Sequence, residues 1–391
     1  MTTTGALVAR VNARGATRWA SRLHPWIYRS DLLDAPGDEP GVVDVVDAGG
    51  RPIGSALWSP VSTISLRMLT HEPRAIDAAF WRERVQQAKT LRDSLRPDAD
   101  SYRLVHAEAD GLPSLIVDRY ADWLVVQFLS AGIERHRDEI RDALVDTLAP
   151  HGILARDDVP IRRHEQLGTG VSVIHGEIPE SIEAREVDVR YVVAPRTGQK
   201  TGAFLDQRGN RARAGSLARG EALDLFTFNG AFALHLARGG ARVTAVDSSS
   251  DALERATLNA RLNGLEDRID CVEANVFDLL PDLERDSRRF DIIVLDPPAF
   301  ARKRDSVDAA LRGYKEVNLR AMRLLAPGGH LLTFSCSYHV GTDRFRTMLE
   351  SAAADAGRPI RWIETLGQAG DHPAILQIPE SSYLKGAILQ G

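Results

Sequence analysis

The chain has 391 residues, more than one hydrophobic core normally organises, so two or three domains are expected at about 150 residues each. Hydrophobic residues make up 43% and charged residues 26%, a composition typical of soluble globular proteins. The formal net charge of −5 excludes a uniformly basic coat for nucleic acid but is compatible with a local basic face.

Two cysteines, Cys271 and Cys336, are too few for a disulfide framework, and no Cys/His cluster indicates a metal site. No uncharged apolar run reaches the length of about 18 residues that a membrane helix needs. The first thirty residues also lack the apolar core of a secretory signal. We therefore expect a cytoplasmic protein with reduced thiols, no metal and no membrane segment.

The first 75 residues have the pattern of short strands and turns. Residues 42–47 and 52–58 are strand-like runs on either side of a glycine turn, and 62–69 alternates like a third strand. This pattern predicts a small β module of barrel size. The first thirty residues contain five arginines and no acid, which is typical either of a solvated surface or of a patch that faces phosphates. These arginines are Arg10, Arg14, Arg18, Arg22 and Arg29.

The middle of the chain, up to about residue 195, mixes helices and strands. The spacing of apolar residues predicts a helix over 76–95, strands at 115–117 and 123–128, and a helix over 131–148.

From about residue 198, short apolar strands alternate with helices, which predicts a parallel, doubly wound α/β sheet. In such a sheet the ligand lies beyond the carboxyl ends of the strands. The expected strands are 222–226, 241–247, 269–273, 290–296 and 330–335, and the expected helices are 230–237 and 250–263.

Polar residues at three strand ends favour a nucleoside ligand. The turn 227–230 follows the first strand, and Asp247 ends the second, about 20 residues after Asp224, where an acid suits ribose hydroxyls or caps a helix. Asn275 follows the third strand and can read the edge of an adenine. The glycines of a pyrophosphate cradle are missing, so the pattern favours S-adenosylmethionine over a nicotinamide dinucleotide.

The fourth strand ends in Asp296, Pro297 and Pro298, a loop that the two prolines stiffen. Amino-group methyltransferases hold a nucleobase amine with a similar Asp/Asn-Pro-Pro-aromatic loop. Here Ala299 follows the prolines and the aromatic residue is displaced by one position to Phe300, which weakens an N-methyltransferase interpretation.

Cys336 distinguishes two methylation chemistries. It follows a buried-looking strand at the edge where the ligand is expected, between Ser335 and Ser337. C5 of a pyrimidine is too weak a nucleophile to take a methyl group from a sulfonium unless a thiolate first adds at C6. A cysteine is thus required for 5-methylation and superfluous for N-methylation. The alternative is a small buried apolar residue, which we accept for Cys271 in mid-strand.

Eight short motifs together give the chain a specific resemblance over essentially its whole length. It resembles the bacterial large-subunit (23S) ribosomal RNA cytosine-5 methyltransferase family. The motifs are His24-Pro25-Trp26, Asp110-Gly111-Leu112-Pro113, Lys200-Thr201-Gly202, Leu205-Asp206-Gln207-Arg208, Asp296-Pro297-Pro298, Arg312-Gly313-Tyr314-Lys315, Thr333-Phe334-Ser335-Cys336-Ser337 and Tyr383-Leu384-Lys385-Gly386.

That resemblance implies three domains within an overall α/β class. A PUA-like RNA-binding β-barrel would span 1–75, a central α+β domain for substrate recognition 76–195, and a Rossmann-like class I methyltransferase domain 196–391.

The resemblance also implies roles for single residues. Cys336 would be the nucleophile, Asp296 would hydrogen-bond the N3/N4 edge of the cytosine, Asp247 would hold the ribose, and Asn275, in place of the more usual Asp, the adenine. The further residues expected at S-adenosylmethionine are Gln207, Phe226, Asn229, Gly230, Val276, Asp296 and Pro297. The residues expected at RNA are Arg14, Arg18, Arg22, Trp26, Arg312, Tyr314 and Lys315; the alternative for the last three is a charged helix face.

The expected activity is therefore methylation of a cytosine C5 in 23S ribosomal RNA, naked or in an assembling large subunit, with a homodimer left open. The alternatives are N-methylation of a base amine and a non-catalytic RNA-binding protein with a vestigial methyltransferase fold. Other RNA cytosine-5 methyltransferases carry a second cysteine where Ala299 stands here. The group that removes the C5 proton therefore has no assignment.

Overall fold

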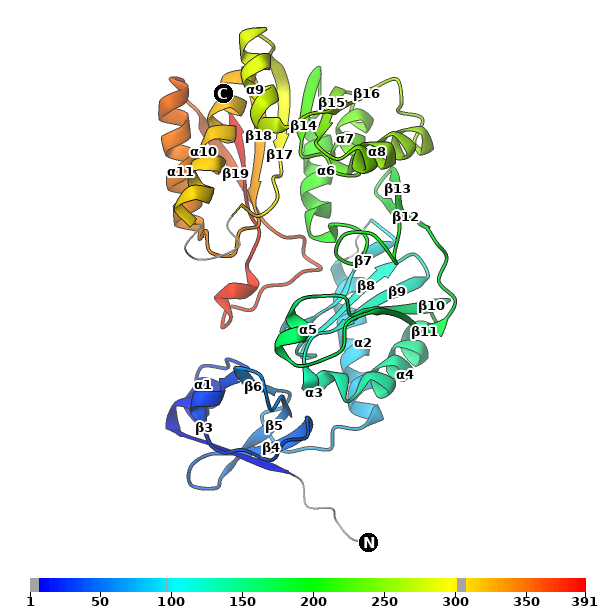
Figure 1. The fold of residues 1–391 in the computed structure, drawn as a ribbon, viewed down its shortest axis with the longest axis vertical. Coiled ribbons are helices and arrows are strands. Elements are labelled where there is room, and N and C mark those ends of the chain that lie inside the picture. The colour runs from blue at the N-terminus through cyan, green and yellow to red at the C-terminus, as the bar shows by residue number, and fades with distance from the viewer. Residues whose placement is uncertain (1–6, 96–97, 301–306) are drawn as a thin grey trace. The chain divides into compact units, whose positions relative to one another are not determined.

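The computed structural model describes residues 7–95, 98–300 and 307–391. The chain divides into two compact units, whose elements are labelled in Figure 1. The first unit comprises residues 1–182, 193–203 and 371–379, and the second comprises 183–192, 204–370 and 380–391. These units are defined by compactness alone, and the expected division into three domains stays a prediction.

The first unit begins with a small sheet and one short helix. Their bounds are β1 Val8–Val11, α1 Ala13–Ala20, β2 Trp26–Tyr28, β3 Leu32–Asp34, β4 Gly41–Val46, β5 Pro52–Trp58 and β6 Ile64–Met68. The sheet has the order β2-β6-β5-β4-β1-β3, and the predicted glycine turn joins β4 to β5 as antiparallel neighbours. Helix α1 begins where the Asn12 side chain accepts a hydrogen bond from the Gly15 amide at 3.0 Å.

The rest of the first unit is a second sheet with helices packed on it. The elements are α2 Ala78–Leu95, β7 Ser101–His106, β8 Leu115–Tyr120, β9 Trp123–Phe128, α3 Ala131–Glu134, α4 Arg137–Leu148, β10 Gly152–Arg156, α5 Ile161–His164 and β11 Val171–Gly176. The strand order is β11-β10-β9-β8-β7, and apolar side chains of α2 and α4 share one core with the sheet. The single helix predicted over 131–148 is wrong: two helices form, because the chain turns at His136, whose backbone leaves helical geometry before α4.

The second unit contains the alternating strands and helices. The elements are β12 Ile182–Glu186, β13 Val189–Val193, α6 Arg208–Leu217, β14 Glu221–Leu225, α7 Ala231–Arg238, β15 Arg242–Asp247, α8 Ser250–Leu262, β16 Ile269–Glu273, α9 Val276–Arg285, β17 Phe290–Leu295, α10 Val307–Leu324, β18 Leu325–Ser335, α11 Thr342–Ala356, β19 Arg361–Leu366 and β20 Lys385–Gln390. The short 3-10 turn Leu205–Gln207 leads into α6. The predicted strands and helices of this region are all present, with ends shifted by a few residues.

The main sheet of this unit has the order β16-β15-β14-β17-β18-β20-β19. The first five strands pair in parallel as predicted, but β20 runs antiparallel to both β18 and β19. The antiparallel pairing at this edge was not predicted from the sequence. Because no helix crosses between β19 and β20, the chain returns beside its own strand in the opposite direction.

Helices cover both faces of this sheet (Figure 1). Leu223 and Leu225 of β14 belong to the large core that α9, α10 and α11 share, whereas Asp224 between them bonds the start of α7. Alternate side chains of β14 thus point to opposite faces, as the period of a strand requires. Among the described residues, no helix combines the length and the apolar character that crossing a bilayer requires.

Candidate functional site

The strand register brings the expected ligand-binding residues to one edge. Leu225 of β14 pairs with Val246 of β15 and with Leu295 of β17. The residues that come next along these three strands, Phe226, Asp247 and Asp296, therefore leave the sheet at the same level. Asp247 and Asp296 are half-buried, and both carboxyl groups act electrostatically on Asp224 beneath them.

The loop between β14 and α7 has an unusual backbone. Phe226, Phe228 and Gly230 have φ angles of 62°, 53° and 80°, in the left-handed region that residues other than glycine rarely adopt. A Cβ at Gly230 would also lie 3.0 Å from the Ala256 side chain, so only glycine fits the approach of α8. Such backbone strain concentrates at ligand-binding sites and makes this loop the candidate cofactor loop.

Asp247 holds the candidate cofactor loop in place. Its Oδ2 accepts a hydrogen bond from the Phe228 amide at 2.9 Å, and its Oδ1 accepts one from the Ser249 amide at 3.0 Å. The side chain that caps α8 belongs to Ser249 rather than to Asp247. A carboxylate has about four lone-pair sites, so Asp247 can accept further bonds from ribose hydroxyls.

Asp224 belongs to the same edge, although the sequence analysis used it only to count spacing. It is 1% exposed, and its Oδ2 accepts hydrogen bonds from the Thr227 hydroxyl at 2.5 Å and from the Ala233 amide at 3.0 Å. Burial raises the pKa of Asp224 to about 7, and the neighbouring carboxyl groups of Asp296 and Asp247 act in the same direction. An acid inside an otherwise apolar strand was the signal that could have identified it.

Asn275 and Val276 begin α9 beyond the end of β16. The Asn275 side chain is exposed, and its Oδ1 accepts a hydrogen bond from the Phe277 amide at 3.0 Å, which caps the helix. Val276 is buried against the core. The amide group of Asn275 thus serves the helix, and its remaining donors and lone pair face outward.

Three other residues expected at the cofactor are buried beside the edge. Gln207 Oε1 accepts a hydrogen bond from the Asn210 side chain at 2.5 Å, and the Asn229 carbonyl accepts one from the Asn259 side chain at 2.9 Å. Pro297 is buried at the end of β17. These contacts fix the walls around the candidate cofactor loop.

An aromatic cluster fills the space beside the Asp-Pro-Pro loop. The Phe300 ring lies 4.6 Å from the Tyr314 ring, 5.9 Å from that of Phe277 and 6.3 Å from that of Phe226. Phe300 therefore packs against protein rings and is not a free platform for a base. This packing disfavours the N-methyltransferase interpretation further.

The RNA contact expected from the Tyr314 side chain is wrong. Tyr314 is fully buried on the inner face of α10, where its hydroxyl bonds the Ser337 hydroxyl at 2.9 Å. A tyrosine on the apolar stripe of a helix packs into the core, whereas its neighbours on the other face reach solvent. Arg312 is exposed, and Lys315 forms a 2.6 Å ion pair with Asp355.

Cys336 is exposed directly after β18, whereas Cys271 is half-buried within β16. Cys271 is thus less buried than the sequence predicts, and the catalytic role of Cys336 stays a prediction. On the neighbouring strand β20, Lys385 lies opposite Ser335 in the antiparallel register, and its side chain is buried. Lys385 belongs to the motif Tyr383-Leu384-Lys385-Gly386, but its place in an apolar strand was the further signal that could have linked it to this site.

The residues at this edge fit S-adenosylmethionine. Three carboxyl groups, Asp224, Asp247 and Asp296, surround a strained loop that a Cβ at Gly230 would disturb. Acids suit both the hydroxyls of a ribose and the positive charge of a sulfonium. Among the described residues, no group of His, Cys, Asp and Glu could hold a metal ion.

The arginine-rich start of the chain lies on the first unit. Arg14 and Arg18 both pair with Asp31, whose side chain is fully buried, so these two arginines anchor α1. Arg22 is exposed. Trp26 is half-buried and donates a hydrogen bond from its indole to Glu108 Oε1 at 2.8 Å. The Arg14 side chain stays 62% exposed despite its ion pair with Asp31, so both Arg14 and Arg22 are accessible.

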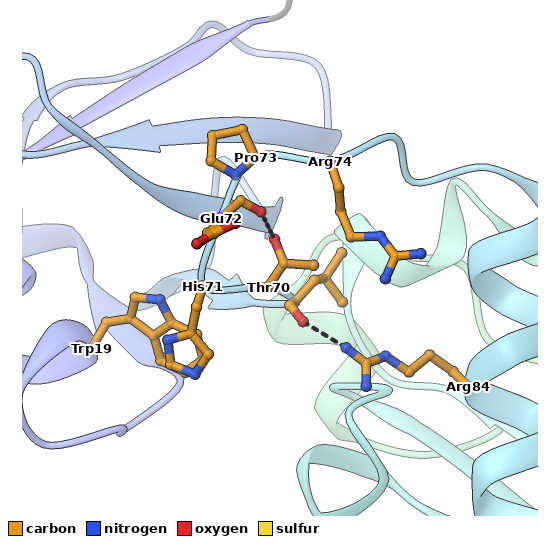
Figure 2. Close-up of a pocket in the computed structure, with 8 residues that line it drawn as sticks. Trp19, Thr70, His71, Glu72, Pro73, Arg74 and Arg84 are labelled. Carbon is orange, nitrogen blue, oxygen red and sulfur yellow. Dashed lines mark hydrogen bonds between the residues drawn. The ribbon is translucent and has the colours of Figure 1, made fainter.

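A second candidate surface lies on the first unit, where the small sheet meets the central part. A cavity of about 450 Å³ is bordered on one side by the ring of His71, which stacks on Trp19 at a centroid distance of 4.0 Å (Figure 2). Arg74 and Arg84 border the other side. The lining residues are Trp19, Leu69, Thr70, His71, Glu72, Pro73, Arg74 and Arg84.

The two arginines of this cavity influence each other. Arg84 donates a hydrogen bond to the Leu69 carbonyl at 3.2 Å, and Arg74 pairs with Glu83 at 3.0 Å. Burial lowers the pKa of Arg84, Glu83 opposes that shift, and Arg74 adds to it. Among the described residues, the buried Nε of Arg84 has no hydrogen-bond partner. An anion between the two guanidinium groups would relieve this repulsion.

Comparison with known families identifies two segments. Residues 103–385 match the S-adenosylmethionine-dependent methyltransferase family, and residues 10–71 match the PUA-like domain. The first match covers more than half of the chain and includes the whole candidate edge.

Among curated proteins, the ribosomal RNA large subunit methyltransferase I of Shewanella denitrificans is 41% identical over 96% of this chain and 97% of its own length. The protein of the same name from Vibrio cholerae is 39% identical over 95% of this chain and 96% of its own. Among solved structures, a SAM-dependent methyltransferase from Streptococcus mutans has a TM-score of 0.82 at 21% identity, covering 98% of this chain and 100% of that chain. The last likeness shows a shared fold.

Proposed function

The chain belongs to the ribosomal RNA large subunit methyltransferase I family of S-adenosylmethionine-dependent enzymes, and from that premise we propose that it methylates C5 of a cytosine in 23S ribosomal RNA through a covalent bond to Cys336. The observation that carries this proposal is the exposed Cys336 at the end of β18, on the sheet edge that also presents Asp247 and Asp296. An N-methyltransferase has no need of a thiol there.

The proposed reaction begins at C6 of the pyrimidine. The Cys336 thiolate forms a bond to C6, and the electron pair of the C5–C6 double bond moves into the ring. Asp296 hydrogen-bonds the N3/N4 edge and stabilises the charge that develops there. Bound S-adenosylmethionine supplies the methyl group that C5 takes up. Loss of the C5 proton to a base then restores the double bond and releases Cys336 as a thiolate.

We assign the S-adenosylmethionine site to the carboxyl edge of the second unit. Asp247 would hold the ribose, because it ends β15 and already bonds the strained loop. Asn275 with Val276 would hold the adenine, because they begin α9 beyond the neighbouring strand β16. Phe226, Asn229 and Gly230 would border the methionine end. The other residues of the assigned site are Gln207, Asp296 and Pro297.

The RNA surface is assigned to both units. On the first unit, this surface comprises the PUA-like segment with the exposed Arg22 and the cavity between His71 and the pair Arg74/Arg84. The cavity offers a stacking ring next to positive charge, which is the combination that single-stranded RNA prefers. On the second unit, Arg312 is the exposed candidate. The 23S identity of the substrate and a homodimer stay predictions.

Trapping the covalent bond tests the proposal directly. RNA that carries 5-fluorocytidine in place of cytidine cannot lose a C5 proton, so the adduct should persist through denaturing electrophoresis in the presence of S-adenosylmethionine. We expect this adduct with the wild-type protein and with Cys271→Ser, but not with Cys336→Ala. Methylation of unmodified RNA by Cys336→Ala should fall by at least about 10³-fold, or roughly 4 kcal/mol in barrier height.

Other outcomes would favour other functions. Full methylation by Cys336→Ala would exclude the thiolate mechanism and support N-methylation. A titration without any affinity for S-adenosylmethionine would support a non-catalytic RNA-binding protein. Mapping the 5-methylcytosine that disappears from ribosomal RNA of a strain without this protein identifies the nucleotide.

A further inference from the structure

A buried lysine lies beside the proposed nucleophile. Lys385 begins β20 and pairs with Ser335, the residue before Cys336 on β18. The whole residue is 8% exposed. Lysine is rarely buried to this degree unless its ammonium group is compensated, because removing the charge from water is unfavourable.

The hydrogen-bond partners of the Lys385 ammonium group are neutral. Its Nζ donates to the Ser337 carbonyl and to the Tyr383 carbonyl, each at 2.8 Å. Among the described residues, no carboxylate forms an ion pair with it. Two of the three donors of the ammonium group are thus used, and its positive charge is solvated only by carbonyl dipoles.

The charged and titratable groups around Lys385 come from several elements. Burial lowers the pKa of Lys385 to about 8, and negative charge on Cys336 acts in the opposite direction. Tyr314 of α10 bonds Ser337, and burial raises its pKa, so this phenol stays neutral. Asp206 Oδ2 accepts a hydrogen bond from the Tyr383 hydroxyl at 2.8 Å. Of these groups, Cys336 is the one whose negative charge raises the pKa of Lys385.

We infer that the Lys385 ammonium group is the counter-ion that keeps Cys336 in its thiolate form before the thiolate adds to a pyrimidine. Coulomb attraction acts equally on both partners, so a lysine that a thiolate stabilises must itself stabilise the thiolate. In the free enzyme the thiol proton leaves to solvent and the ammonium group keeps its own protons. When the sulfur–C6 bond forms, the negative charge moves from sulfur to the ring, and it returns to sulfur on release. Lys385 is thus a positioning residue that acts through Cys336.

The inference rests on the proposed function for the role of Cys336, but its test needs neither RNA nor S-adenosylmethionine. The rate of alkylation by iodoacetamide follows the thiolate fraction and can be measured against pH by peptide mass in a Cys271→Ser background. We expect a midpoint below the value of about 8.5 for a free cysteine. Lys385→Met should raise that midpoint by at least about one pH unit, which slows alkylation at pH 7 about tenfold.

Lys385→Arg is the matched control, because it keeps the positive charge at the end of a long side chain. It should keep the low midpoint if it folds, which circular dichroism can check. The same midpoint in wild-type and folded Lys385→Met proteins would overturn the inference, while the 5-fluorocytidine adduct would still support the covalent mechanism. Conversely, methylation by Cys336→Ala would exclude the covalent mechanism. A low alkylation midpoint of Cys336 in the wild-type protein would still support the inference about Lys385.

Turnover gives a second readout. Lys385→Met should lower kcat without changing KM for S-adenosylmethionine, and the deficit should shrink between pH 7 and pH 9.5 as the thiolate forms without help. A purely structural lysine would instead give a deficit that does not depend on pH, and such a result would contradict the inference.

Discussion

Buried charges play opposite parts in two regions of this molecule. In the first unit, Arg92 is bound to Asp110, and Arg103 forms two hydrogen bonds with Asp118, at 2.5 and 3.1 Å. The remaining donors of Arg92 bond the Arg103 carbonyl at 2.9 Å and the Asp371 carbonyl at 2.8 Å. Each buried charge of this ion cluster meets an opposite charge.

The carboxyl edge of the second unit differs. Asp224 and Lys385 are buried with neutral hydrogen-bond partners, and burial moves the pKa of each toward neutrality, to about 7 and about 8. Paired charges fix chain segments to one another, while charges held without a permanent counter-ion can respond to a ligand or to a reaction. We therefore expect the paired charges of the first unit to stabilise the fold, and the buried charges at the carboxyl edge to respond to a ligand or to the reaction.

Breaking the ion cluster of the first unit should give the largest effect on stability. Asp110→Ala leaves the buried Arg92 without its carboxylate and should lower the free energy of unfolding by about 3–5 kcal/mol. Denaturant unfolding followed by tryptophan fluorescence measures it. The control is Asp93→Ala. Asp93 pairs with Lys89 on the exposed face of α2, the helix that also carries Arg92, so its loss should lower the free energy of unfolding by at most about 1 kcal/mol. Equal losses of stability in the two variants would show that the buried Arg92–Asp110 pair stabilises the fold no more than a surface pair does.

Replacing Asp224 by a residue that does not titrate should change how the stability of the protein depends on pH. A pKa raised from 3.8 to about 7 means that the folded state binds the proton more tightly, so this contribution to stability is complete below pH 3.8 and is lost as pH rises through 7. The free energy of unfolding of Asp224→Asn, relative to that of the wild type, should therefore rise by roughly 3 kcal/mol between pH 4.5 and pH 7.5. Unfolding curves of both proteins at the two pH values provide the measurement. A difference that does not change with pH would show that Asp224 titrates normally.

The smallest expected effect concerns the surface arginines. The side chains of Arg14 and Arg22 are both exposed, but the Arg14 guanidinium already pairs with the carboxylate of the buried Asp31. Arg22→Gln should therefore lower the slope of log binding constant against log salt concentration by about 0.7 if it contacts one phosphate of single-stranded RNA, and Arg14→Gln should leave the slope almost unchanged. Titrations of a ribosomal RNA fragment at several salt concentrations measure both slopes. A larger change for Arg14→Gln would reverse the assignment.

Much of the second unit could be predicted from the sequence, because strands such as 290–296 and helices such as 250–263 carry strong local patterns. The antiparallel β20 was missed because pairing between residues far apart in the chain leaves no local pattern. Tyr314 was misassigned for another reason: its motif indicated an RNA contact, but the tyrosine lies on the apolar stripe of α10 and is buried. A family motif shows that a residue type is present at a position. Whether its side chain is exposed depends on the residues packed around it.

The sequence alone was enough to predict the alternating strands and helices of the second unit, the strand ends at which polar residues gather, and a cysteine at one of those ends. The electrostatic state of these groups depends on the folded chain. Asp224 is desolvated by the elements packed around it, and Lys385 lies opposite Ser335, the residue before Cys336, because β20 returns beside β18. A pKa depends on the charges and the solvent within a few ångströms, and in this protein long-range strand pairing assembles that environment.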